Sequence, residues 1–102
     1  MINETDLSAW EYYDQPPLFE LSQYLVLGRD NCSYCDKAKK LLTDLGFKFD
    51  YRDILSISLL DRQNLEEIAG DPFRTVPQIF TYNMGGALLY IGGYNELISS
   101  LL

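Results

Sequence analysis

The sequence lacks histidine and contains only two cysteines in 102 residues. No imidazole is available as a general acid or base, so proton transfer must rely on thiols, carboxylates or solvent. No segment approaches the roughly 18–20 apolar residues that a membrane-spanning helix needs. Basic residues are also few, 8 against 15 acidic ones, and the net charge of −7 argues against nucleic acid or an anionic membrane as a partner.

The chain has the size and composition of one globular domain, since 47% of its residues are apolar. Residues 1–14 are acidic and lack the basic-then-apolar layout of a signal peptide. We therefore expect a cytoplasmic protein. In that compartment thiols stay reduced, and a close pair of cysteines is more often catalytic than structural.

The two cysteines form the motif Cys32-Ser33-Tyr34-Cys35, which follows an apolar run at 24–27 and a polar turn at 28–31. A helical pattern begins at this motif, so Cys32 is expected at a helix N-terminus. Unpaired N–H groups and partial positive charge there stabilise a thiolate. Cys35 is then close enough to close a disulfide, and the motif indicates redox chemistry.

Other interpretations of the motif are weaker. A zinc site needs four ligands, and without histidine or a third cysteine it would need carboxylates or a second chain. A structural disulfide closing so small a ring adds little stability. Two inert core cysteines fit a strand-to-helix junction poorly. Asn31-Cys32-Ser33 also matches a glycosylation acceptor, but nothing marks the chain as secreted.

The hydrophobic pattern predicts an α/β domain with the order β-α-β-α-β-β-α. Alternating or continuous apolar residues indicate strands, and apolar residues three and four apart indicate helices. The elements are expected at 24–27, 35–45, 47–52, 58–69, 78–82, 87–91 and 95–102. Ser58 is expected to cap the fourth of these elements, a helix, and Gly70 to end it. A parallel crossover followed by an antiparallel hairpin then gives a four-stranded mixed sheet flanked by helices.

Residues 1–22 form an acidic, aromatic extension ahead of the domain at 23–102. Thr5-Asp6 could cap a short helix at 7–13 that Pro16 would end. We interpret the extension as a flap packed on the domain, because exposing so many aromatic rings would invite association. A partner-binding arm and a partly disordered extension are the alternatives.

Three motifs follow one another at fixed places: the cysteine motif, Thr75-Val76-Pro77, and Gly92-Gly93-Tyr94-Asn95. Together they resemble the glutaredoxins, small proteins with the thioredoxin-like fold, over residues 23–102. The resemblance implies a monomeric, glutathione-dependent thiol–disulfide oxidoreductase. Its substrates would be glutathione mixed disulfides and disulfide-containing proteins such as ribonucleotide reductase. It also implies that Cys32 is the nucleophile and Cys35 the resolving thiol.

The same resemblance implies a groove for glutathione. Arg29 stands where lysine is usual, and its charge would favour the Cys32 thiolate and attract a carboxylate. The loop before a cis proline would pair with the glutathione backbone, and the last helix would offer its N-terminus to a carboxylate. The expected groove residues are Arg29, Tyr34, Arg74, Thr75, Val76, Pro77, Gly93, Tyr94 and Asn95.

The sequence departs from the family pattern at three places. Ser33 stands where proline is usual, and a residue between the two cysteines changes the reduction potential of the pair. Tyr94 replaces a small residue, and Asn95 stands where aspartate is usual, able to cap a helix but without a charge for the glutamyl ammonium. Two alternatives follow. The chain could be a redoxin reduced by thioredoxin reductase, or Cys32 and glutathione from two chains could hold a [2Fe-2S] cluster.

Overall fold

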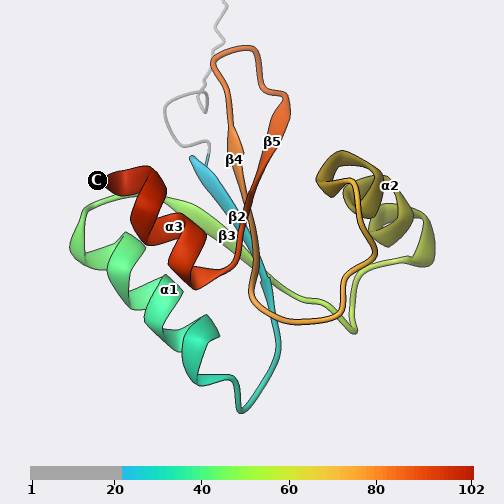
Figure 1. Cartoon of the computed structure of the whole chain (residues 1–102), viewed down its shortest axis with the longest axis horizontal. Coiled ribbons are helices and arrows are strands. Elements are labelled where there is room, and N and C mark those ends of the chain that lie inside the picture. The colour runs from blue at the N-terminus through green and yellow to red at the C-terminus, as the bar shows by residue number, and fades with distance from the viewer. Residues whose placement is uncertain (1–21) are drawn as a thin grey trace, which may run out of the picture.

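The computed structural model describes residues 22–102 and contains seven regular elements (Figure 1). The strands are β2 (Tyr24–Gly28), β3 (Phe49–Asp53), β4 (Gln78–Tyr82) and β5 (Leu88–Gly92); the helices are α1 (Ser33–Asp44), α2 (Leu59–Ala69) and α3 (Tyr94–Leu101). The predicted order of elements is confirmed. The expectations for the extension, including the helix at 7–13 and the flap, fall on residues 1–21 and lie outside the described residues.

The sheet has the strand order β3-β2-β4-β5. Strands β2 and β3 are parallel and joined through α1, whereas β4 pairs antiparallel with both β2 and β5. Val26 in the central strand lies opposite Tyr51 on one side and Ile79 on the other. The sheet is therefore mixed, as the crossover and hairpin predict.

Helices lie on both faces of the sheet (Figure 1), with α1 and α3 on one face and α2 on the other. Because successive side chains of a strand point to opposite faces, Val26 packs toward α1 and α3, while Leu25 and Leu27 pack toward α2. Burial on both faces explains why β2 reads as a continuous apolar run. This arrangement fixes the end of β2, from which the cysteine motif extends.

Local signals in the sequence set the helix ends. The Ser58 hydroxyl accepts a hydrogen bond from the backbone N–H of Asp61 at 3.0 Å and caps α2, as predicted. Helix α2 ends at Gly70, whose φ of 83° lies in the left-handed region that favours glycine. The second expected strand begins at Phe49 instead of residue 47, because the Phe47 N–H is bonded to the carbonyl of Leu42 at the end of α1.

Candidate active site

The cysteine motif begins at the N-terminus of α1. After β2 the chain turns through Asn31, which has a positive φ of 57°, and Cys32 is the N-cap in an extended conformation. Cys32 and Cys35 form a disulfide with their Cα atoms 5.2 Å apart. The Cys35 N–H donates to the Cys32 sulfur at 3.2 Å. Such a bond, with the helix dipole, stabilises the thiolate that forms when the disulfide opens.

The two sulfurs differ in their access to solvent. Cys32 is partly exposed, whereas Cys35 is fully buried beneath the first turn of α1. A substrate disulfide can therefore reach Cys32 but not Cys35. This asymmetry is what the predicted roles of attacking and resolving thiol require.

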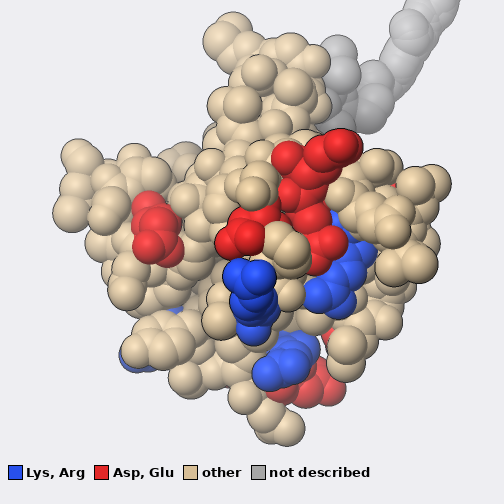
Figure 2. All heavy atoms as spheres, turned by 45° about the vertical axis from the view of Figure 1, so that its right-hand side comes forward, with Lys and Arg blue, Asp and Glu red and all other residues tan. Residues whose placement is uncertain are grey.

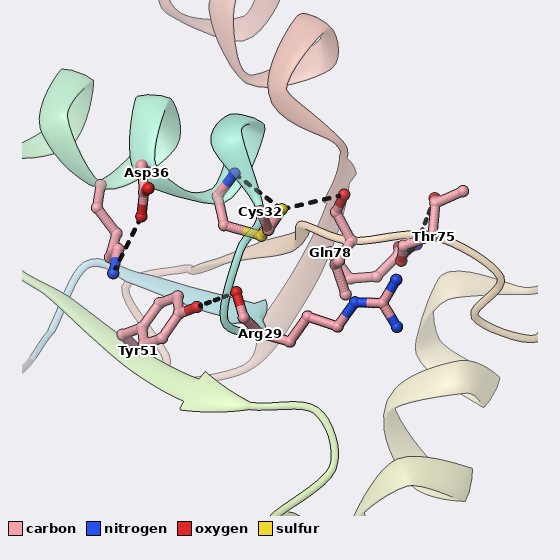
Figure 3. Close-up of a disulfide and its surroundings, with 9 residues drawn as sticks. Arg29, Cys32, Asp36, Tyr51, Thr75 and Gln78 are labelled. Atoms are coloured by element: carbon pink, nitrogen blue, oxygen red, sulfur yellow. Dashed lines mark hydrogen bonds and ion pairs between the residues drawn. A yellow bond between two sulfur atoms is a disulfide. The ribbon is translucent and has the colours of Figure 1, made fainter.

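Tyr51 from β3 points its hydroxyl toward Arg29, three residues before the cysteine motif (Figure 3). Its hydroxyl donates to the Arg29 carbonyl at 3.5 Å, and the Lys39 ammonium lies 4.0 Å from the centre of its ring. Burial, followed by the nearby carboxylates of Asp53, Asp36 and Asp30, raises the pKa of Tyr51. The phenol therefore stays neutral at physiological pH and acts as a hydrogen-bond donor.

The loop before β4 lies directly beside Cys32. The Val76–Pro77 bond is cis, as the resemblance implied, and the Val76 carbonyl oxygen is 3.8 Å from the Cys32 sulfur. A disulfide sulfur carries no hydrogen, so this is a contact in the oxidised protein and a hydrogen bond only to a Cys32 thiol. The backbone of Val76 is thus within reach of any group bonded to that sulfur.

Two hollows flank this loop, and Thr75 and Val76 line both of them. The α3 hollow, about 260 Å³, is also lined by Tyr34, Pro77, Gly93, Tyr94, Asn95 and Glu96. The α2 hollow, about 110 Å³, is also lined by Arg29, Ile54, Leu55, Arg62, Phe73 and Arg74. The structure therefore brings all nine residues of the expected groove to one or other side of a single loop.

The start of α3 differs from the expectation. Gly93 is the N-cap, so the predicted cap at Asn95 is wrong and Asn95 lies in the first turn of the helix. The carboxylate of Glu96 accepts the Gly93 N–H at 2.8 Å and supplies a negative charge in the α3 hollow. Sequence analysis missed Glu96, although a carboxylate three residues after a helix N-cap is the spacing of a capping box.

The α2 hollow carries positive charge. Arg62, which sequence analysis also missed, is held by the carboxylate of Glu66 at 3.3 Å and by the Phe73 carbonyl at 3.1 Å. Arg74 is exposed and pairs with Asp71 at 3.6 Å, and Arg29 is exposed as well. Figure 2 shows basic side chains gathered among acidic ones on the side of the molecule that carries α2.

Within residues 22–102, no group of three or more histidine, cysteine, aspartate or glutamate side chains is arranged to hold a metal ion. In the same part of the chain no helix has the length and apolar character to cross a membrane.

A partly exposed sulfur and a buried sulfur at a helix N-terminus, beside a cis-proline loop, define a dithiol oxidoreductase with a thioredoxin-like fold. Similarity to known proteins narrows this class. The family model "Glutaredoxin" matches residues 24–84. Glutaredoxin 1 of Escherichia coli is 35% identical over 79 residues, spanning 72% of this chain and 86% of that protein.

Solved structures agree. The reduced glutaredoxin of Escherichia coli superposes with a TM-score of 0.58 at 34% identity, over 78% of this chain and 92% of that one. A buckwheat glutaredoxin–glutathione complex gives a TM-score of 0.59 at 28% identity, over 78% of this chain and 68% of that one. The chain belongs to the glutaredoxin family, whose members are thiol–disulfide oxidoreductases.

Proposed function

We propose that this protein uses glutathione as its reductant and reduces both protein disulfides and glutathione mixed disulfides. The observation that carries the proposal is the position of the Cys32 sulfur. It lies 3.8 Å from the Val76 carbonyl, at a loop with a hollow on either side. A peptide bonded to Cys32 through its own sulfur would pair with the Val76 backbone in the manner of an added strand.

The charges of the two hollows support glutathione as that peptide. Glutathione carries a carboxylate at each end and an ammonium at its glutamyl end. The N-terminus of α3 suits the glutamyl carboxylate, and the carboxylate of Glu96 suits the ammonium. The arginines of the α2 hollow suit the glycyl carboxylate. In the buckwheat relative, glutathione is present in the complex that was solved.

The reaction proceeds by two balanced exchanges. The Cys32 thiolate attacks the glutathionyl sulfur of a mixed disulfide, and the other thiol leaves as a thiolate that takes a proton from solvent. A second glutathione thiolate then attacks the Cys32–glutathione disulfide, releasing glutathione disulfide and the Cys32 thiolate. For a protein disulfide, Cys35 displaces the substrate thiol from Cys32 and closes the active-site disulfide, which two glutathiones reduce again.

The finer assignments rest on the resemblance. They are a cytoplasmic location, a monomeric state and protein substrates such as ribonucleotide reductase. The alternative of reduction by thioredoxin reductase was based on Asn95, which lacks the negative charge of the usual aspartate. The neighbouring Glu96 supplies a carboxylate in the same hollow and weakens that reason. The [2Fe-2S] alternative draws on Ser33. Visible-range absorption of the protein prepared anaerobically with glutathione would support a cluster, and a colourless preparation would argue against one.

The test compares two substitutions with glutathione as the only reductant. Cys32→Ser should abolish reduction of a glutathione mixed disulfide, because it removes the attacking sulfur. Cys35→Ser should keep much of this activity and lose reduction of protein disulfides. Equal loss in both variants, or turnover with thioredoxin reductase but not with glutathione, would contradict the proposal.

A further inference from the structure

Gln78 is the one buried polar side chain among residues 22–102, with 6% of its surface exposed. Both ends of its amide are bonded (Figure 3 shows the end at Thr75). The amide nitrogen donates to the Thr75 carbonyl at 2.9 Å, and the amide oxygen accepts from the Tyr90 hydroxyl at 2.6 Å. A carbonyl oxygen only accepts, so the nitrogen must face Thr75 and the amide has one possible orientation.

This amide fixes a peptide plane next to the active-site sulfur. In a trans peptide the C=O and the following N–H point in opposite directions, and the only cis bond among the described residues is Val76–Pro77. Because Gln78 holds the Thr75 carbonyl toward the interior, the N–H of Val76 points outward. The structure gives that N–H no acceptor within residues 22–102, and Val76 lines both hollows.

We infer that Gln78, clamped by Tyr90, is a positioning residue that presents the Val76 N–H to the backbone of a peptide substrate bonded to Cys32. The inference rests on the proposed function and deepens it, since it names the part of the protein that selects peptidyl disulfides. Tyr90 suits the clamp. Its ring packs edge-on against Phe80 at 5.2 Å, and burial raises its phenol pKa, so it remains a donor.

The inference predicts that Gln78 affects some disulfide substrates and not others. A disulfide without peptide groups has nothing for the Val76 N–H to bind, so its reduction depends on the Cys32 thiolate alone. A glutathionyl disulfide uses both the thiolate and the oriented N–H. Loss of the Gln78 amide should therefore slow the second kind of substrate only.

The experiment measures second-order rates of the reduced protein with glutathione disulfide and with hydroxyethyl disulfide, which has no peptide group. Gln78→Met keeps the length of the side chain and removes the hydrogen bonds of the amide. We therefore expect about a tenfold loss of rate with glutathione disulfide, which is what one oriented hydrogen bond contributes. The rate with hydroxyethyl disulfide and the pKa of the Cys32 thiol should stay unchanged. Tyr90→Phe leaves the amide in place without its clamp and should give a smaller loss of the same kind.

Thr81→Val is the matched control, because Thr81 lies in the same strand and its hydroxyl donates to the Gln23 carbonyl at 3.0 Å, away from the site. It should change neither rate. Unchanged selectivity in both Gln78→Met and Tyr90→Phe would overturn the inference, as would an equal loss with both substrates. If Gln78→Met does not fold, Tyr90→Phe alone decides. A wild-type protein with no preference for glutathione disulfide would instead refute the proposed function.

Discussion

Substitution of Gly28 by alanine should destabilise the protein through the contacts around the cysteine motif. Gly28 is buried at the end of β2, and a Cβ built there would lie 2.5 Å from the Tyr51 hydroxyl oxygen and 2.9 Å from the Cys35 sulfur. Both distances are shorter than packed atoms tolerate, so the ring or the sulfur must move. Such overpacking typically costs about 1–3 kcal/mol, a large share of the roughly 5–15 kcal/mol that stabilises a domain.

The backbone of Gly28 gives no reason for this loss. Its φ lies outside the positive range that favours glycine. Gly→Ala at such a site otherwise stabilises by about 0.4–1 kcal/mol through the unfolded chain. The measured loss in the free energy of unfolding is therefore smaller than the steric cost of the added methyl group. Thermal unfolding should show it as a lower Tm, by roughly 4–8 °C for each kcal/mol at this chain length.

Two further variants isolate the cause. Gly85→Ala is the control, because a Cβ there meets only the Asn83 side-chain oxygen at 3.4 Å, an ordinary contact. The double variant Gly28→Ala with Tyr51→Leu removes the crowded ring and should recover part of the lost free energy of unfolding relative to Tyr51→Leu alone. Equal stability of Gly28→Ala and Gly85→Ala would refute this reasoning.

Two other predictions concern stability. Ser58→Ala removes the cap of α2 and should lower the free energy of unfolding by about 1 kcal/mol in urea denaturation, whereas Ser58→Asp keeps an acceptor and should lose much less; equal losses would contradict the capping role. Burial raises the pKa of four tyrosines above the ordinary value of 10.0: Tyr24, Tyr51, Tyr82 and Tyr90. Their neutral forms are favoured in the folded protein, so this stability is fully present below pH 10 and is lost as the pH rises through the higher folded pKa. Denaturation between pH 8 and 11 should show the free energy of unfolding falling above pH 10, and a constant value would contradict the assignment.

The sequence predicted the fold well where a periodic pattern or a local cap carries the information. The apolar run at 24–27 predicted a buried strand, and Ser58 and Gly70 predicted the ends of α2, because each signal acts within a few residues. The predicted bounds of an element were wrong where a contact with another element determines its first residue. Phe47 fits the alternation of a strand, yet its N–H is used by the end of α1, so the strand starts later.

The same distinction applies to the site. Arg29, the cysteines and the proline loop were visible because each motif is short and contiguous. Gln78 and Tyr90 are twelve residues apart on neighbouring strands, and each alone reads as an ordinary strand residue. Their hydrogen bond depends on the register between β4 and β5, which the hydrophobic pattern does not specify to the single residue.

The register between β4 and β5 also determines where α3 begins, and so the position of the α3 hollow. Phe80 pairs with Tyr90, but Ile79 pairs with Gly92, so Ile91 is an extra residue and the pairing shifts by one at this point. Such a bulge bends the strand and changes the direction in which the chain leaves it. Gly92 accommodates it with a φ of 129°, and a Cβ built on Gly92 would lie 2.8 Å from the Cγ atom of Glu96 in the first turn of α3. Gly92 thus lets the chain turn from β5 into α3, and the start of α3 and the proline loop together line the α3 hollow.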